Sequence, residues 1–455
     1  MPAQSRLGRP LTGLFLDFGF GLISTVDDLR WLRLFAVTCL GGLGITVYMF
    51  LRASGHSAAF AVVGATGLAM LTPFQAFVSW AVCFPYILGA WVAFVGGWHV
   101  TRHVNREVQE GHLLPRWSSI FVSAGLVAAA SMIYQPIALL FWVSSTWLLV
   151  HCHCELKVFV ARVGAVFVAG VGGIAVGFLA FRVGVTMHGE HDSGRSGFTD
   201  DIFGKLGWFF SEALPQVTQL QWAGFKLPMG LALTIIAYSV VGSFLGKEFS
   251  VRKAIPRVLF AFVAFFLCYL TSLIAMESWA ASRTLVAVFA LFWLFFLNTH
   301  WRLVVGVFAK GRTSILSGGR LHLRDRVVVP FQTGCAFAAA LTLSLMGQFG
   351  AVQGFLIPQS YEWARVHQSV AEFARDSDRS SQHIVVRQSS WHVSSRTPLY
   401  DEHWLQSGSH GWAAVAMTRL ALNAIGEDSR NWSVEVVSYD QDHREVDVDM
   451  AKFAF

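Results

Sequence analysis

The fold class follows from residues 284–300, TLVAVFALFWLFFLNTH, which contain no Asp, Glu, Lys or Arg. A helix of this kind is apolar on every face, so lipid or other apolar helices must surround it. The whole chain shares this character: 54% of its 455 residues are hydrophobic and 14% are charged, against about 25% charged residues in an ordinary soluble domain. Since so few charges cannot cover a soluble surface, the sequence predicts a polytopic membrane protein.

Nine further segments are apolar enough to cross a bilayer, some of them as short or kinked helices. Together with 284–300 they give about ten predicted transmembrane helices, near 33–51, 57–72, 83–99, 117–133, 136–151, 163–184, 226–246, 258–276 and 327–347. The connections on one side of these segments hold 16 Lys and Arg, and those on the other side hold three. By the positive-inside rule the richer side is cytoplasmic. The connection at 185–225 and the tail after about 350 are then expected outside the cytoplasm.

The C-terminal tail differs in composition from the rest of the chain. Residues 350–455 carry nine Lys and Arg against 14 Asp and Glu, whereas the preceding residues carry 25 against 14. Beyond Pro358 the pattern predicts two helices, at 361–376 and 412–425, and two strands, at 384–386 and 434–437. We therefore predict an all-α multi-span domain over 33–349 followed by a small periplasmic α/β domain over 350–455.

Residues 1–32 precede the first predicted span and, with ten spans and an external C-terminus, must also be external. Residues 11–25 are apolar, but as a helix they would cover about 22 Å against about 30 Å of hydrocarbon. Asp17 lies in the middle of this stretch. We predict a short amphipathic or re-entrant helix here. The topology also leads us to expect either that a first spanning helix is missing from this sequence or that 11–25 spans poorly.

Several function classes are disfavoured by composition and motif. Basic residues in so apolar a chain mark cytoplasmic loops rather than nucleic-acid binding. The six cysteines lie in or beside apolar stretches, which argues against a disulfide framework. The tract His151-Cys152-His153-Cys154 is one short cluster, whereas a zinc site draws ligands from two separated pairs, so no metal site is predicted. No Walker, GxSxG, HExxH or GxGxxG motif appears in proper context, which disfavours nucleotide-driven and serine-hydrolase chemistry.

Polar residues on the external side are the candidate site. Asp27 or Asp28 could act as general base for an acceptor hydroxyl, although both could simply begin the span at residue 33. Tyr134 and Gln135 lie in a turn between two apolar runs, where a Gln is costly, although the turn could be capped by its own side chain. Arg283 is suited to bind phosphate, although Trp279 and Arg283 could also be ordinary interfacial anchors.

These residues resemble one known family. Gly8-Arg9-Pro10-Leu11-Thr12, followed by an apolar stretch and an acidic residue, looks like the external first loop of the integral-membrane glucosyltransferases of O-antigen conversion (Gtr-type, GT-C-like). Ser131-Met132-Ile133-Tyr134-Gln135-Pro136 is similar to the Tyr-Gln turn of that family. The tail also looks like theirs, with Tyr361-Glu362 near Pro358 and Asp401-Glu402 before the second helix. Family members carry an acidic pair upstream of the Gly-Arg-Pro motif; this chain lacks it, in agreement with a missing first helix.

The resemblance implies a function at the periplasmic face of a bacterial inner membrane. A hexose, glucose in this family, would move from a polyprenyl-phosphate sugar to a polysaccharide such as O-antigen. Asp27 or Asp28 would be the base, Arg283 would contact the phosphate, and Arg9 and Gln135 would line the sugar. The implied partners are the lipid-linked donor, the polysaccharide acceptor and membrane lipid, without nucleic acid. No nucleotide or redox cofactor is needed, and a divalent cation stays open. A flippase or transporter of lipid-linked sugar and a polysaccharide polymerase are the alternatives.

Overall fold

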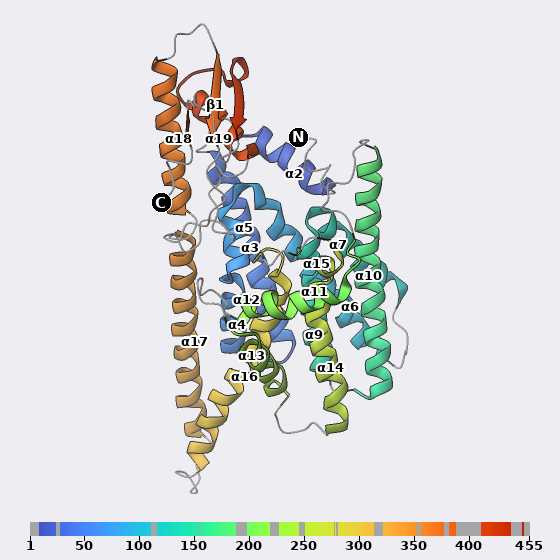
Figure 1. The fold of residues 1–455 in the computed structure, drawn as a ribbon. Helices are drawn as coiled ribbons and strands as arrows, with labels where there is room; N and C mark the ends of the chain where they lie inside the picture. The colour runs from blue at the N-terminus through green and yellow to red at the C-terminus, as the bar shows by residue number, and fades with distance from the viewer. Residues whose placement is uncertain are drawn as a thin grey trace. The chain divides into compact units, whose positions relative to one another are not determined.

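The computed structural model describes most of the chain, and its contacts divide it into two compact units (Figure 1). One unit comprises residues 1–21 and 33–347, and the other comprises residues 22–32 and 348–455. The described residues are 9–23, 28–110, 116–152, 154–187, 198–218, 227–244, 251–276, 278, 281–313, 322–352, 356–376, 382–387, 411–437 and 448–449.

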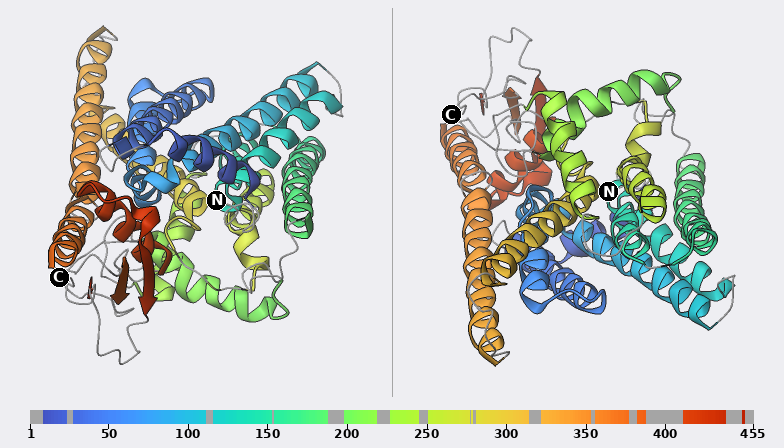
Figure 2. Two further views of the ribbon diagram at one scale, coloured as in Figure 1. Left: turned by 90° about the horizontal axis from the view of Figure 1, so that it is seen from above. Right: turned by 90° about the horizontal axis from the view of Figure 1, so that it is seen from below.

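The first unit is built almost entirely of helices among its described residues. In chain order these are α2 (Pro10–Gly21), α3 (Leu29–Ala53), α4 (Ala58–Ala69), α5 (Thr72–Ser79), the 3₁₀ turn η2 (Ala81–Cys83), α6 (Phe84–Gln109), α7 (Trp117–Ile133), α8 (Gln135–Ala138), α9 (Leu140–Val150), α10 (Leu156–Met187), α11 (Ile202–Trp208), the π-turn η3 (Phe209–Ala213), α12 (Leu214–Thr218), α13 (Met229–Gly242), α14 (Val251–Leu267), α15 (Leu270–Ile274), α16 (Val286–Thr313) and α17 (His322–Ala351). Helices α6, α7 and α10 lie side by side, as the end-on views in Figure 2 show.

Within the described residues, four helices are long and apolar enough to cross a membrane: Leu29–Ala53, Ala81–Glu107, Leu156–Val183 and Val286–Leu303. A fifth candidate is the pair α4 and α5, which is bent by 53° at its break. Shorter apolar helices occupy the other predicted spans. The prediction of a mostly helical chain with several apolar helices that could span a membrane is therefore confirmed, while the total of about ten spans stays a prediction.

The stretch that suggested the membrane assignment forms the core of the first unit. The window Val286–Leu303 in α16 is 72% buried inside the protein. The indole N–H of Trp293 donates to the carbonyl oxygen of Gly64 on α4 at 3.0 Å. A Cβ on Gly67 would lie 2.0 Å from the Trp293 ring, so α4 can approach only because this residue is glycine. Protein, rather than lipid, therefore surrounds most of this apolar helix.

Small residues let α6 and α9 pack closely. The Ser144 hydroxyl donates to the carbonyl oxygen of Phe94 at 2.8 Å, and the Ser145 hydroxyl donates to that of Gly97 at 3.3 Å. A Cβ on Gly97 would lie 2.2 Å from the carbonyl oxygen of Phe141. Close backbone approach and hydroxyl-to-carbonyl bonds are typical of helix contacts in membranes, where hydrophobic burial gives little driving force.

The break between α4 and α5 has a sequence cause. Pro73 lies in the first turn of α5, where a proline is tolerated, and its ring ends the straight course of the preceding helix. The side-chain Nε2 of Gln75 donates to the carbonyl oxygen of Ala69 at 3.0 Å. This bond satisfies an acceptor at the end of α4. The bend directs the end of α5, at Ser79 and Trp80, toward the start of α6.

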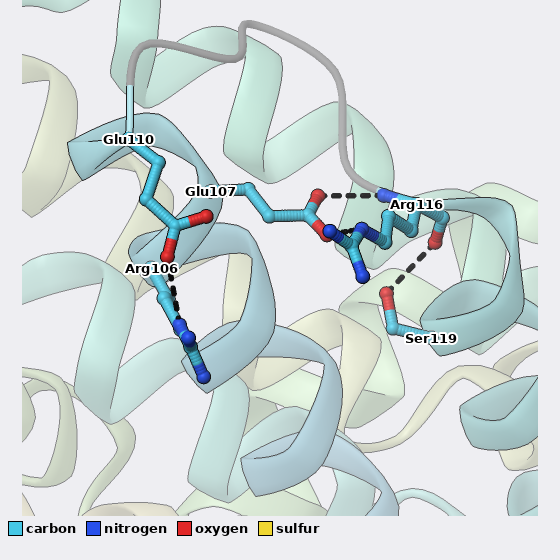
Figure 3. Close-up of polar contacts among 5 residues, drawn as sticks. All are labelled: Arg106, Glu107, Glu110, Arg116 and Ser119. Carbon is cyan, nitrogen blue, oxygen red and sulfur yellow. Dashed lines mark hydrogen bonds and ion pairs between the residues drawn. The ribbon is translucent and has the colours of Figure 1, made fainter.

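A carboxylate joins α6 to α7 (Figure 3). Glu107 is 5% exposed; its Oε2 accepts the backbone N–H of Arg116 at 2.6 Å, and its Oε1 lies 3.4 Å from Arg116 Nε. Arg116 occupies the N-cap position of α7, at the end of the helix where backbone N–H groups have no partner within the helix. On the surface of α6, Arg106 and Glu110 form a more exposed ion pair at 2.9 Å.

The second unit contains the α/β fold predicted for the tail. Helix α18 (Ile357–Asp376), strand β1 (His383–Arg387), helix α19 (Gly411–Ala424) and strand β2 (Ser433–Val437) occur in the predicted order. Strand β1 pairs in parallel with β2 and with the two-residue β3 (Val448–Asp449), which the sequence analysis missed. The core of this unit is formed by residues such as Val366, Val370, Ile384, Val386, Leu422 and Trp432.

Candidate functional site

Arg9 directly precedes α2, and the local sequence fixes its position. Pro10 takes the first helical position, where its missing N–H costs nothing, and the Arg9 carbonyl accepts the N–H of Gly13 at 2.9 Å. The Thr12 hydroxyl donates to the carbonyl oxygen of Ile133, the last residue of α7. Helix α2 therefore packs against the end of α7, and Arg9 reaches the residue that follows that helix.

That residue is Tyr134, which forms a buried aromatic cluster with Phe77 and Tyr86. The rings of Tyr86 and Tyr134 are stacked, with centroids 4.6 Å apart and planes at 11°. Phe77 contacts both rings edge-on, at 5.5 and 6.4 Å. Arg9 Nη1 donates to the Tyr86 hydroxyl at 3.2 Å, and Arg9 Cζ lies 4.5 Å from the centroid of the Tyr134 ring. The guanidinium is thus held by a hydroxyl and a ring face, and neither carries a formal charge.

Two further arginines contact Ser79 and Trp80, at the end of α5. Arg283 precedes α16, and its Cζ lies 5.6 Å from the centroid of the Trp80 ring. Arg283 and Arg9 both act electrostatically on the Tyr86 hydroxyl, so both charges are near it. Arg33, on α3, donates through Nε to the carbonyl oxygen of Ser79 at 3.2 Å. Arginines from three separate parts of the sequence therefore contact residues between the end of α5 and the first turn of α6.

Two nitrogen donors near the aromatic cluster have no hydrogen-bond partner within the part of the chain that the structure describes. They are Arg9 Nε and Trp80 Nε1, and both atoms are buried. Each such donor costs about 1–3 kcal/mol when left unsatisfied. Other described nitrogens share the feature, among them Trp142 Nε1, Trp147 Nε1 and Arg162 Nε, so it points to a site here only together with the arginines and rings around it. An anionic oxygen is the strongest partner for a guanidinium N–H. The site can therefore bind a phosphate or carboxylate, with aromatic faces beside it for a sugar or a lipid.

The structure brings together part of the predicted site. Arg9 and Tyr134 are in direct contact, and Arg283 lies within electrostatic range of the same cluster through Tyr86. Gln135 begins α8 beside Tyr134 and is half-buried, with interactions of its own. Tyr134 of the Tyr-Gln turn and Arg9, which precedes α2, are far apart in the sequence but are in contact in the structure.

Of the two predicted acids, Asp28 belongs to the described residues. Asp28 is half-buried, directly precedes α3 and belongs to the second unit. Asp27 lies outside the described residues, as does Trp279. The roles of the three residues therefore stay predictions.

The sequence analysis missed Tyr86, Trp80, Phe77 and Arg33. A signal for two of them exists: Trp80 directly follows α5, and Tyr86 follows Pro85 in the first turn of α6, so both lie near a proline at a helix end, as Tyr134 lies near Pro136. An aromatic residue in such a connection usually marks the membrane interface, so the pattern alone does not distinguish anchoring from binding.

A metal site does not emerge from the described part of the chain, where no three His, Cys, Asp or Glu side chains come close enough to hold an ion. The assignment of function therefore depends on the arginines and aromatic rings around Tyr86. No family model, no curated protein and no solved structure matches this chain.

Proposed function

We propose that this protein is a membrane glycosyltransferase that moves a hexose from a polyprenyl-phosphate sugar to a polysaccharide acceptor. One observation carries the proposal. The Arg9 guanidinium is fixed between the Tyr86 hydroxyl and the Tyr134 ring, and its buried Nε keeps a donor without a partner among the described residues.

The chemistry of this arrangement matches a lipid-linked sugar phosphate better than a soluble anion. The arginine lies at the ends of apolar helices, where a polyprenyl chain can remain in the hydrocarbon. A guanidinium binds phosphate oxygens through paired N–H donors. Aromatic rings such as those of Tyr134 and Trp80 give an apolar face to the sugar. Phosphate, sugar and lipid would each have a complementary surface within one site.

The proposed transfer needs a base for the acceptor hydroxyl and positive charge beside the phosphate. A carboxylate, Asp28 or Asp27, takes the proton of the acceptor hydroxyl while its oxygen attacks the anomeric carbon of the sugar. The bond from this carbon to the phosphate oxygen breaks, and polyprenyl phosphate leaves with the electron pair. Arg9 and Arg283 stabilise the negative charge that grows on the phosphate. The step is complete without a nucleotide or a redox cofactor.

The finer features of the proposal follow from the resemblance and the loop charges. The hexose would be glucose, and the acceptor would be O-antigen or a similar cell-surface polysaccharide. The reaction would take place at the periplasmic face of a bacterial inner membrane, with residues 350–455 on the same side.

The test is a transfer assay with the protein in proteoliposomes. Polyprenyl phosphate carrying radiolabelled glucose is the donor, O-antigen polysaccharide is the acceptor, and label in the polysaccharide is measured. We expect transfer that Arg9→Ala abolishes and Arg106→Ala, an exposed arginine on α6, leaves unchanged.

Three other outcomes would overturn the proposal. Movement of the labelled lipid between leaflets without transfer would identify a flippase. Lengthening of the polysaccharide by whole repeat units would identify a polymerase. Transfer that is equal in the Arg9→Ala and wild-type proteins would remove the arginine site from the reaction.

A further inference from the structure

A patch of exposed apolar side chains lies around the start of α11, on segments that are distant in the sequence. Phe203, in the first turn of α11, is 87% exposed, the largest fraction for any large apolar side chain in the part of the chain that the structure describes. It forms the α11 patch together with four residues that are 41–61% exposed: Phe198, Ile202, Ile274 and Met276. Exposed apolar patches mark surfaces that contact a membrane or another protein.

Backbone contacts join the segments of the α11 patch into one surface. Phe198 and Ala275 form an antiparallel bridge, and the N–H of Thr199 donates to the carbonyl oxygen of Ile274 at 3.0 Å. The Asp201 carboxylate caps the N-terminus of α11, where it accepts a backbone N–H at 2.7 Å. These hydrogen bonds fix the start of α11 beside the end of α15.

The opposite side of the same helical segment is packed against the protein. Phe209, in η3 directly after α11, is fully buried, and its ring is stacked on that of Tyr269 with centroids 5.2 Å apart. Lys205, on α11 itself, is also buried. Ile202 and Phe203 are therefore exposed on a helix that is otherwise held firmly in place.

The α11 patch lies beside the last two turns of the candidate span in α10, Leu156–Val183. The ring of Phe198 lies 5.3 Å from that of Phe178, and its centroid lies 6.0 Å from Cζ of Arg182. Leu179, the neighbour of Phe178 on α10, is 63% exposed. The patch therefore adjoins the apolar surface of α10 that a bilayer would cover.

Helix α11 also has the orientation of a helix at a membrane surface. Together α11, η3 and α12 form one helical segment over residues 202–218, and Figure 1 shows this segment running across the direction of α10. A helix that lies in the plane of the membrane buries its apolar side chains at the boundary between headgroups and acyl chains. An apolar first turn beside the end of a span fits this position.

We propose that the α11 patch inserts into the lipid leaflet at the C-terminal end of α10 and binds phospholipid there. Bilayer lipid is the partner because the patch continues the exposed apolar surface of a candidate span. Residues 198–208 of the connection after α10 are then an element inserted in the membrane surface rather than a solvated loop. The exposed acids Asp200 and Asp201 stay on the side of the headgroups and water.

The test is photo-cross-linking of the full chain in proteoliposomes of phosphatidylethanolamine and phosphatidylglycerol. p-Benzoylphenylalanine replaces Phe203, so that one exposed ring takes the place of another, and lipid attached after irradiation is measured by mass spectrometry. The same group at Leu179 on α10 is the control for lipid contact. The same group at Arg430, which is 88% exposed in the second unit, is the control for a polar surface. We expect position 203 to attach lipid in a yield close to that of position 179 and about tenfold above that of position 430.

Three results would overturn the proposal. A lipid yield at position 203 as low as that at position 430 would place the α11 patch in water. A cross-linked dimer of the chain would identify an interface between two copies. A loss of phospholipid labelling when decaprenyl phosphate is added would assign the patch to the polyprenyl chain of the donor. None of these measurements requires sugar transfer, so the proposal can fail or hold independently of the proposed function.

Discussion

The two ends of helix α7 hold arginine side chains in opposite ways. At its start, Arg116 faces the buried carboxylate of Glu107, with Nε 3.4 Å from Oε1. Beyond its end, Arg9 lies over the ring of Tyr134 and donates to the hydroxyl of Tyr86. Among the residues that the structure describes, the first arginine has an acidic partner and the second has none. The first contact compensates a charge that the fold has buried, whereas the second leaves a positive charge that an anion can use.

The comparison extends to the energetic role of each end. A buried carboxylate is costly unless it is paired and hydrogen-bonded, so the contacts of Glu107 belong to stability. Contacts with aromatic rings stabilise an arginine less than an ion pair with a carboxylate does. They fix the guanidinium in place but leave its positive charge uncompensated. The difference suggests that the end near Tyr134 is organised for binding, and each prediction below tests one side of this contrast.

The largest effect is expected from removing a guanidinium at the Tyr134 end. Arg9→Ala and Arg283→Ala should each lower glucosyl transfer by about 100-fold or more, because each removes a preorganised charge facing the leaving phosphate. Initial rates in proteoliposomes measure the effect, and Arg106→Ala is the matched control. Unchanged turnover in either variant would remove that arginine from the site.

A smaller effect, on stability alone, is expected at the other end. Glu107→Ala should destabilise the protein by about 1–3 kcal/mol, since it leaves the N–H of Arg116 without its acceptor and removes the ion pair. Reversible unfolding in mixed micelles measures this loss. The transfer rate of the folded fraction should stay at the wild-type value. A fall in rate as large as that of Arg9→Ala would break the contrast between the two ends.

A single hydroxyl gives a smaller effect again. Tyr86→Phe removes the acceptor that orients Arg9. A hydrogen bond to a charged group contributes about 1.5 kcal/mol at the low end of its range, which suits a bond of 3.2 Å, so transfer should fall by about tenfold. Tyr238→Phe is the matched control, because Tyr238 is a half-exposed tyrosine on α13 that contacts His300. Equal rates in both variants would mean that the Tyr86 hydroxyl does not position Arg9.

Part of this site could be predicted from sequence because polar groups stand out in an apolar chain. Gln135 and Arg283 stand out on that ground, Arg9 follows from the family resemblance, and the structure places Arg9 and Arg283 near one tyrosine. That tyrosine, Tyr86, was missed, since a tyrosine at the start of an apolar helix is also the usual membrane anchor. Whether Tyr86 is a membrane anchor or part of a site depends on its hydrogen bond with Arg9, which lies 77 positions away in the sequence. No local sequence pattern predicts that contact.

In the fold, too, a local sequence pattern predicts some features, whereas others depend on contacts between residues far apart in the sequence. Helices and strands of the tail follow from periodicity, and α18, β1, α19 and β2 occur where the pattern predicts them. The surroundings of α16 do not follow, because a helix that is apolar on every face fits lipid and protein equally well. Its burial against α4 depends on Gly67, whose lack of a side chain matters only once the partner helix is known.

The smallest effect is expected for the exposed ion pair of Arg106 and Glu110 on the surface of α6. Their side chains are 74% and 45% exposed, and a pair in water at this spacing contributes about 0.3–0.5 kcal/mol. Glu110→Ala should therefore change the free energy of unfolding by less than about 0.5 kcal/mol, and the difference should vanish in high salt, where exposed charges are screened. Glu107, one turn earlier and buried, should keep its effect in the same salt. If salt removed both effects equally, burial would not be what distinguishes the two carboxylates, and the structural role assigned to the Arg116 end of α7 would fail with it.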